Sequence, residues 1–310
     1  MPRSYAMVGV GAVGGYYGGM LHRAGQEVHF LLHNDFEHVR TQGLLLETPQ
    51  FTERYSNLHI YQDVRDMPRC DVVVVALKTT ANQLLPHLLP TLVKEGGTVL
   101  VLQNGLGSED EVHRAVPQAH ILGGLCFICS GKAGPGHIRQ TDYGSVRLGQ
   151  YRADAQPSGL TPLMKEIAED FQRAGVNIIL EEDLLAARWK KLVWNVPFNG
   201  LSVVLNASTD RLLQNPATRK LCRALMDEVV AGADAAGHPI DPAFADKMIA
   251  DTERMKPYLP SMKTDFDQGR PLEIEHIYGH PLRAAQEHGL TLPRMEMLYQ
   301  LLSFMQQAPR

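Results

Sequence analysis

The stretch Met7-Val8-Gly9-Val10-Gly11-Ala12-Val13-Gly14 leads from an apolar run into a helical pattern that ends at Gly25. In the spacing Gly9-x-Gly11-x-x-Gly14, the first glycine permits a tight turn, the second lets backbone amides approach a pyrophosphate, and the third allows helix and strand to pack closely. A helix that begins there directs its unpaired N–H groups at the phosphates. A strand predicted at residues 27–32 supplies the context that this motif requires. The loop of Gly9, Val10, Gly11, Ala12, Val13 and Gly14 is therefore predicted to bind a dinucleotide; the alternative is a glycine turn without a ligand.

Predicted strands and helices alternate through the first half of the chain. Strands are predicted at residues 70–78, 97–102, 120–130, 136–150 and 176–180, and helices at residues 80–92 and 162–173. The valines at 72–75 are typical of a strand buried on both faces, and residues 43–61 read as a β excursion at an edge of the sheet. The alternation implies a mostly parallel sheet with helices on both faces. Lys78 and Asn104, each just after a strand, then lie in the ligand crevice at the carboxyl ends of the strands.

The pattern changes near residues 181–183, beyond which nearly everything is predicted to be helical. Helices are expected at residues 184–205, 216–236, 242–254, 272–288 and 295–306. A chain of 310 residues exceeds the usual size of one domain. The sequence therefore predicts an α/β fold with a Rossmann-type dinucleotide-binding domain at residues 1–182 and an all-α domain at residues 183–310.

Composition and charge argue against several classes of partner. A net charge of −4 offers no attraction for nucleic acid or for an anionic membrane. No apolar stretch approaches the ~20 residues of a membrane-spanning helix, and no signal-type segment opens the chain, so a cytoplasmic protein is expected. The four cysteines are too scattered for a disulfide framework. Cys126 and Cys129 lie in an extended apolar run, where buried thiols are expected rather than a redox or metal site.

One predicted helix of the second half carries a polar stripe. Within residues 189–199, Lys191, Asn195 and Asn199 are spaced i, i+4 and i+8 and fall on one face, between large apolar residues. An unpaired polar group on a buried helix costs about 1–3 kcal/mol, so these side chains require partners. Pro197 removes a helical hydrogen bond and bends the helix beside Asn195. Two interpretations stay open here: the polar groups tie two helices together, or they line a ligand cleft.

Taken in order, these motifs resemble the ketopantoate reductase (2-dehydropantoate 2-reductase) family. The resemblance rests on the glycine loop, Lys78 after a valine-rich strand, Asn104-Gly105-Leu106-Gly107, the helix with Lys191, Asn195 and Asn199, Ser261-Met262, and Glu273. It covers essentially the whole chain. The resemblance implies that 2-dehydropantoate (ketopantoate), a 2-keto acid, is reduced to pantoate by hydride from NADPH, on the route to pantothenate and coenzyme A.

The resemblance also implies the catalytic residues. Lys191 would be the general acid that hydrogen-bonds the keto oxygen and protonates the developing alkoxide, and Glu273 would bind the substrate hydroxyl. Independently, carbonyl reduction needs a cation or donor aimed at the oxygen, and no cluster with zinc-ligand spacing is present in the sequence to supply one. Lys190 lies about 100° around the helix and is predicted to face elsewhere. Glu275 competes with Glu273, whose alternative interpretation is an acid that stabilises a helix N-terminus.

The remaining site residues are likewise implied by the resemblance. Asn195, Asn199 and Ser261 would hold the polar ends of the substrate, although a serine after a proline is by itself usually a turn or capping residue. Asn104 would lie at the nicotinamide and the reacting carbonyl, and Lys78 near the cofactor ribose.

The residues after the second predicted strand bear on the choice of cofactor. At this place an acidic residue is usual for NAD and a basic one for NADP. This sequence has His33-Asn34-Asp35, whereas the resembling family commonly has arginine in place of His33. His33 and Asn34 can hydrogen-bond a 2′-phosphate and Arg40 can reach it, but Asp35 would repel it unless turned away. NADP (NADPH), with His33 among its contacts, is the predicted cofactor, and NAD is the alternative.

Two other hypotheses keep the fold and change the function. One is a reductase of another 2-keto acid, because a missing methylene changes discrimination by only about 1–3 kcal/mol. The other is a non-catalytic NADP-binding sensor, whose signature would be loss of Lys191 or of the substrate clamp; both are present. A site divided between Asn104 and Lys191 would favour closure of the two domains. The expected partner is a small-molecule 2-keto acid, and pairing into a homodimer is left open.

Overall fold

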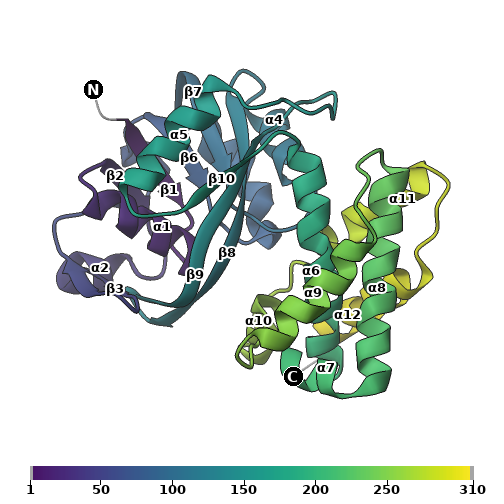
Figure 1. The fold of residues 1–310 in the computed structure, drawn as a ribbon. Coiled ribbons are helices and arrows are strands. Elements are labelled where there is room, and N and C mark those ends of the chain that lie inside the picture. The colour runs from purple at the N-terminus through teal and green to yellow at the C-terminus, as the bar shows by residue number, and fades with distance from the viewer. Residues whose placement is uncertain (1–2, 308–310) are drawn as a thin grey trace. The chain divides into compact units, whose positions relative to one another are not determined.

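The computed structural model describes residues 3–307, which form two compact units (Figure 1). The sheet unit runs from Arg3 to Gln103 and includes Ser108–Leu184. The helical unit runs from Leu185 to Gln307 and also holds the short segment Asn104–Gly107. Among the described helices, none is long and apolar enough to cross a membrane.

A single sheet runs through the sheet unit. Its strands are β1 (Ser4–Val8), β2 (Glu27–Leu31), β3 (Leu44–Glu47), β4 (Thr52–Tyr55), β5 (His59–Tyr61), β6 (Cys70–Val75), β7 (Val93–Val101), β8 (His120–Gly134), β9 (His137–Gln150) and β10 (Ile178–Glu181). They lie in the order β4-β3-β9-β8-β7-β6-β1-β2-β5, and β10 pairs with β9. From β5 to β8 every neighbouring pair is parallel, as predicted. Two pairs are antiparallel: the long hairpin of β8 and β9, and the short hairpin of β3 and β4.

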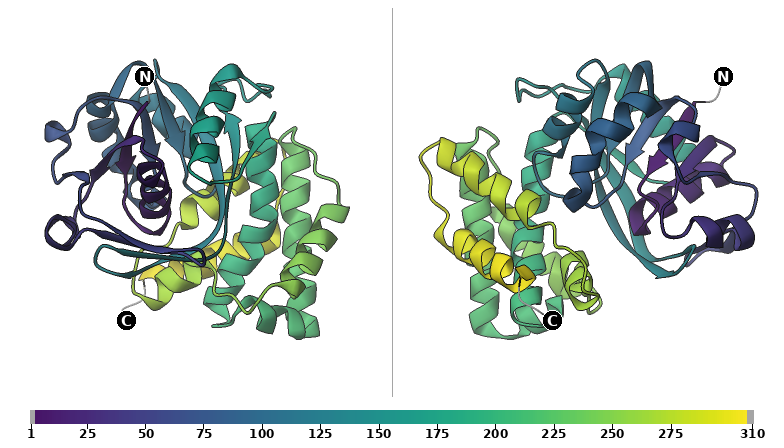
Figure 2. Two further views of the ribbon diagram at one scale, coloured as in Figure 1. Left: turned by 60° about the vertical axis from the view of Figure 1, so that its left-hand side comes forward. Right: turned by 180° about the vertical axis from the view of Figure 1, so that it is seen from behind.

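The predicted β excursion at residues 43–61 forms both edges of the sheet. Strands β3 and β4 make a hairpin at one edge, whereas β5 pairs with β2 at the other. Only residues 56–58 join β4 to β5. Because such a short link spans at most about 14 Å, the sheet must curl until its two edges approach each other. Helix α1 (Ala12–Arg23) lies inside this curl and packs on β1, β2, β3, β8 and β9 (Figure 2, left, purple helix).

Helices cover both faces of the sheet. Val72 and Val74 of β6 point into the core beneath α1 and α5 (Pro162–Arg173), whereas Val73 and Val75 point into the core beneath α3 (Leu85–Leu92) and α4 (Ser108–Ala115). This alternation explains why four successive valines are needed. Helix α4 was not predicted, because its sequence is mostly polar and Val112 is its one large buried apolar residue. The shorter helical pieces are η1 (Val64–Asp66), α2 (Phe36–Gln42) and η2 (Thr79–Leu84), the last taking the place of the first turn predicted for residues 80–92.

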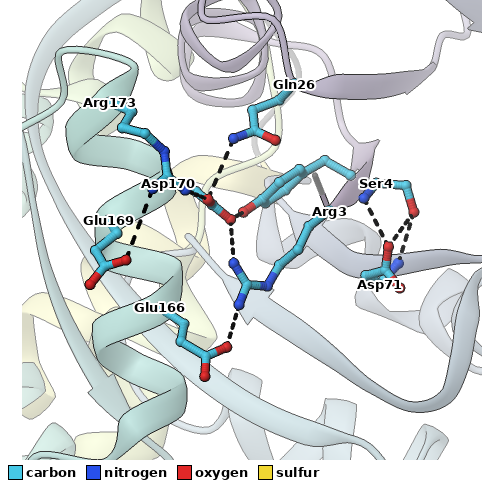
Figure 3. A network of polar contacts seen from close by, with 9 residues as sticks. Arg3, Ser4, Gln26, Asp71, Glu166, Glu169, Asp170 and Arg173 are labelled. Atoms are coloured by element: carbon cyan, nitrogen blue, oxygen red, sulfur yellow. Dashed lines mark hydrogen bonds and ion pairs between the residues drawn. The ribbon is translucent and has the colours of Figure 1, made fainter. Parts of the chain in front are cut away.

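A buried carboxylate ties α5 to the start of β1 (Figure 3). Asp170, with 2% of its surface exposed, accepts hydrogen bonds from Tyr5 Oη at 2.6 Å and Arg3 Nη1 at 2.9 Å, and Arg173 also pairs with it. Burial first, and then the Asp170 hydrogen bond, raise the pKa of Tyr5 well above its ordinary value. This network lies at the amino end of β1, opposite the end that leads into the glycine loop.

The helical unit is built around α6 (Leu184–Val204). The other helices are α7 (Thr209–Gln214), α8 (Pro216–Ala235), α9 (Ala243–Arg254), α10 (Ser261–Asp267), α11 (His280–Glu287) and α12 (Pro293–Gln307). Leu192, Val196 and Phe198 of α6 are at most 1% exposed, as predicted for a buried helix. Helices α7 and α10 were not predicted, since six or seven residues carry too little periodicity. The helix predicted at 272–288 begins with a π-helix, Glu275–Gly279, that leads into α11.

Candidate active site

The glycine loop joins β1 to α1. Gly9 has φ +98° and a side chain there would meet Leu77 N at 2.5 Å; a side chain at Gly14 would meet Gly9 O at 2.0 Å. Close packing is enough to explain why glycine is required at these two positions, without any ligand. At Gly11, by contrast, a Cβ would meet nothing within 4 Å, so the space in front of the helix is open. Helix α1 has neither a side-chain cap at its N-terminus nor an acid in its first turn. The loop therefore fits the pyrophosphate of a dinucleotide, which would accept from the exposed N–H groups.

The neighbours of this loop lie at the point where the strand order reverses. β1 pairs with β2 on one side and with β6 on the other, and Ala76 N, just after β6, donates to Val8 O at 2.8 Å. Ligands of doubly wound sheets bind outside the carboxyl ends of strands at such a point. Lys78 follows β6 here and is exposed. The structure thus brings Lys78 and the glycine loop to the same edge of the sheet.

The turn after β2 shows where the carboxylate of Asp35 points. Its carboxylate is buried and accepts from Lys132 Nζ at 2.7 Å and from Gly136 N at 3.0 Å, so it is turned toward the β8–β9 hairpin. His33 is exposed, and its Nδ1 lies 2.5 Å from Asn34 Oδ1. Arg40 donates to Glu37 at 2.7 Å. Of the groups considered for a 2′-phosphate, His33, Asn34 and Arg40 are all exposed, and each makes a local side-chain contact: His33 with Asn34, and Arg40 with Glu37.

In the helical unit, α6 presents the predicted polar stripe. Asn199 is 1% exposed and its Oδ1 accepts from Met262 N at 3.2 Å, which ties α6 to the first turn of α10 beside Ser261. Asn195 is 5% exposed and lies one turn from Lys191 on the same helix. Lys191 is half-buried and Lys190 is exposed. Asn199 thus joins two helices, as one interpretation of the stripe predicts, and a cleft-lining role of Lys191 and Asn195 stays a prediction.

The two competing glutamates, Glu273 and Glu275, have different surroundings in the structure. Glu275 pairs with Arg283 and accepts from Tyr299 Oη at 3.2 Å. Partial burial acts to raise its pKa, but the hydrogen bond and charge of Arg283 hold the pKa of Glu275 below its usual value. Glu273, only 5% exposed, lies immediately before the helical stretch and its carbonyl accepts from Ile277 N at 3.2 Å. Ser261 is the first residue of α10, directly after its N-cap residue Pro260.

The segment Asn104–Gly107 packs on the π-helix. His280 N donates to Glu275 O, five residues back, and the next donor in this series would be Pro281, which has no N–H. The carbonyl of His276 accepts instead from Leu106 N at 2.9 Å. Leu106 is buried in the core of the helical unit. Asn104, half-buried, is therefore held by contacts of its own segment with the helical unit, although it follows β7 in sequence.

Sequence reasoning missed several residues that shape these places. Gly105, Leu106 and Pro281 build the contact just described, and the glycines of Asn104-Gly105-Leu106-Gly107 were its only available signal. Lys132 is distant in sequence from the turn that it contacts, so no pattern pointed to it.

The four cysteines are free thiols. Cys126 is buried and Cys129 half-buried, both on β8. Burial raises the pKa of Cys70 to about 11 and that of Cys222 to about 12, so these two are protonated at neutral pH.

Comparison with known proteins gives concordant matches. Residues 5–153 match the family model described as ketopantoate reductase PanE/ApbA, and residues 183–306 match the model of its C-terminal part. A curated 2-dehydropantoate 2-reductase of Nostoc sp. is 54% identical over 98% of this chain and 95% of its own length. The crystal structure of 2-dehydropantoate 2-reductase from Geobacter metallireducens superposes with a TM-score of 0.92 at 38% identity, covering 97% of this chain and 99% of that one.

A more distant structure shares the fold alone. The ternary structure of D-mandelate dehydrogenase with NADH and anilino(oxo)acetate has a TM-score of 0.87 at 23% identity, covering 98% of each chain. Its cofactor and ligand belong to that protein.

Proposed function

Because this chain belongs to the ketopantoate reductase family, we propose that it reduces 2-dehydropantoate to pantoate with NADPH as the hydride donor. The observation that carries the proposal is the stripe on α6, where the half-buried Lys191 lies one turn from the largely buried Asn195. A half-buried cation and a buried amide on one helix face suit a polar substrate that is itself removed from water.

When bound, the nicotinamide supplies hydride to the keto carbon. Lys191 is proposed to donate a hydrogen bond to the keto oxygen and then its proton as negative charge develops there. Asn195 is proposed to hydrogen-bond a polar end of the substrate. Asn199 uses its amide oxygen on Met262 N, so its amide nitrogen is the group proposed for substrate, with Ser261 beside it. Glu273 is proposed to accept from the substrate hydroxyl.

The cofactor contacts are proposed in the same way. The amides of residues 9–14 hold the pyrophosphate, with Gly11 leaving the space. Lys78 lies near the ribose and His33 near the 2′-phosphate, while Asn104 orients the carboxamide or the reacting carbonyl. These roles follow the resemblance to the family; Lys78 and His33 come after β6 and β2, at the carboxyl ends of strands where ligands of such sheets bind.

One spectrophotometric experiment tests substrate and cofactor together. Oxidation of NADPH and of NADH is measured with ketopantoate, 2-ketoisovalerate and pyruvate. We expect the highest kcat/KM for ketopantoate with NADPH. Equal and slow turnover of all three acids would contradict the substrate, and faster reaction with NADH would contradict the cofactor.

The role of Lys191 is tested by substitution. Lys191→Ala is expected to lower kcat by roughly 10²–10⁴, the worth of a positioned acid, with little change in the dissociation constant of NADPH. The matched control is Lys190→Ala on the exposed side of the same helix, which should leave kcat unchanged. Normal turnover by Lys191→Ala would exclude it as the proton donor.

A homodimer is proposed for the assembled enzyme. Met297, Leu301 and Phe304 of α12 follow an i, i+4, i+7 spacing and are 51%, 41% and 74% exposed. An apolar stripe of this kind commonly marks a protein contact. Phe304→Glu should shift the sedimentation coefficient to that of a monomer; a wild type that is already monomeric at micromolar concentration would refute the proposal.

A further inference from the structure

Lys132, near the tip of the β8–β9 hairpin, is held at the end of β2. Its ammonium lies 2.7 Å from Asp35 Oδ1, and Asp35 directly follows His33 and Asn34. We propose that Lys132 binds the 2′-phosphate of NADPH and is a determinant of preference for NADPH over NADH, with Asp35 as the residue that positions it. This inference rests on the proposed NADPH dependence.

The outer part of β8 borders both elements of the dinucleotide site. Ser130 Oγ donates to Ala12 O, in the glycine loop at the first residue of α1, at 3.0 Å. Two residues further along, Lys132 reaches the turn after β2. The hairpin is fixed in this place, because Leu45 N donates to Gly136 O at 2.7 Å and Gly136 N donates to Asp35 Oδ2 at 3.0 Å. The Lys132 side chain thus starts from an anchored strand beside the predicted adenosine end of the cofactor.

Asp35 occupies a position where an acid normally favours NAD. It follows β2, where an acidic side chain hydrogen-bonds the ribose 2′-hydroxyl. It is also the N-cap residue of α2, yet its side chain makes no capping hydrogen bond. The carboxylate instead faces the hairpin, 8% exposed, and its charge is balanced by Lys132. The Asp35 carboxylate therefore points away from the place expected for the ribose, and it holds the Lys132 ammonium instead.

The Lys132 ammonium has donors to spare. An ammonium carries three N–H donors, and among residues 3–307 Asp35 is the one hydrogen-bonding partner of Lys132. The side chain is 38% exposed, so the remaining donors are accessible. A phosphate monoester carries about −1.5 to −2 charges near neutral pH and requires cationic donors. Arg40 pairs with Glu37 on the exposed surface of α2, whereas Lys132 is held against the residue that directly follows His33 and Asn34.

The experiment measures binding without turnover. Isothermal titration on the full chain gives the dissociation constants of NADPH and NADH, and of adenosine 2′,5′-bisphosphate and 5′-AMP, fragments that differ only in the 2′-phosphate. The variants are Lys132→Gln and Lys132→Arg. The matched control is Lys94→Gln, because Lys94 forms a similar half-exposed ion pair with Asp71, at 2.8 Å, near the amino ends of β6 and β7.

Lys132→Gln should weaken NADPH and the bisphosphate roughly tenfold, the size of one hydrogen bond to a charged group, and change NADH and 5′-AMP by less than about twofold. Lys132→Arg should retain most of the NADPH affinity. Lys94→Gln should bind all four like wild type. Equal weakening of NADPH and NADH by Lys132→Gln, or none, would overturn the assignment.

Two further comparisons keep the result interpretable. If Lys132→Gln folds poorly because Asp35 is left buried without its cation, the double variant Asp35→Asn, Lys132→Gln removes both charges and should show the same selective loss of NADPH. A wild type that prefers NADH would refute the proposed cofactor. A wild type that prefers NADPH, together with a Lys132→Gln variant that keeps this preference, would refute the role of Lys132 alone.

Discussion

Replacing Gly105 by alanine should detach the segment that carries Asn104. Gly105 has φ +87°, and a Cβ there would lie 2.2 Å from the carbonyl oxygen of His276. The same oxygen accepts from Leu106 N at 2.9 Å. It belongs to the π-helix, where Pro281 supplies no replacement donor. The added methyl group therefore competes with the hydrogen bond that docks the segment.

The magnitude follows from these distances. A left-handed backbone costs an alanine roughly 1–2 kcal/mol. A normal carbon–oxygen contact is about 3.3 Å or more, so the segment must move away by roughly 1 Å. This lengthens the Leu106 hydrogen bond to roughly 3.9 Å, beyond a useful length, at a cost of about 1 kcal/mol. Partial exposure of Leu106, 7% exposed at present, adds about 1 kcal/mol more. We expect Gly105→Ala to cost about 3–4 kcal/mol of stability in total. The cost cannot exceed the free energy at which the segment detaches locally.

The control is Gly289→Ala. Gly289 has φ +76°, but a Cβ there would meet nothing within 4 Å, so its substitution carries the backbone term without the collision. The assay is kcat/KM for ketopantoate with NADPH, together with hydrogen exchange of the Leu106 amide. Gly105→Ala should lose roughly 100-fold in kcat/KM, because a displacement of about 1 Å in a positioning group has that effect, and its Leu106 amide should exchange faster. If Gly105→Ala retains the turnover and amide protection of Gly289→Ala, docking of this segment does not position Asn104.

Two predictions concern stability. Asp170→Ala removes the acceptor shared by Arg3, Tyr5 and Arg173 and should destabilise the sheet unit by about 3–5 kcal/mol in urea unfolding, whereas Glu166→Ala at the exposed end of the same network should cost less than about 1 kcal/mol; equal effects would contradict a buried, cooperative network. For Asp71, partial burial acts to raise the pKa, but hydrogen bonds from Lys94 and Ser4 lower it to about 2. Its contribution to the free energy of unfolding is therefore present above about pH 4 and lost as pH falls toward 2. The difference in unfolding free energy between wild type and Asp71→Asn, about 1 kcal/mol after allowance for its exposure, should vanish over that range. A difference independent of pH would contradict the assignment.

Local patterns were enough for much of the fold. The glycine loop, the valines of β6 and the periodic apolar residues of α6 each predicted an element that the structure contains. The match to the two family models confirms the resemblance drawn from the same motifs. Short or polar helices were not predicted from the sequence, because α4 buries few apolar side chains and because α7 and α10 are too short to show a period. The β excursion at 43–61 was recognised, but its division between the two edges was not, because strand partners are distant in sequence.

Some features of the candidate site could likewise be predicted from local spacing, and others could not. Register on α6 separated Lys191 from Lys190, since helical spacing alone decides which residues share a face. Spacing could not choose between Glu273 and Glu275, and the resemblance to the family favoured Glu273; in the fold, Glu275 contacts Arg283 and Tyr299 from other helices. The roles of Lys191, Asn195, Asn199, Ser261 and Glu273 in catalysis remain proposals for the experiments above.

The sequence by itself determined the elements whose cause is local: where glycines permit a turn, where apolar residues recur with the period of a strand or helix, and hence a dinucleotide fold followed by helices. Only the tertiary structure decided what Asp35 does. Read along the chain, it is an acid where NAD would be preferred; in the fold, Lys132 and Gly136 from a distant hairpin neutralise and bury it. Likewise only the fold shows that the carbonyl of His276, deprived of a donor by Pro281, holds Leu106. The energy of a charge or a hydrogen-bonding group depends on its neighbours in space, and a one-dimensional pattern does not contain them.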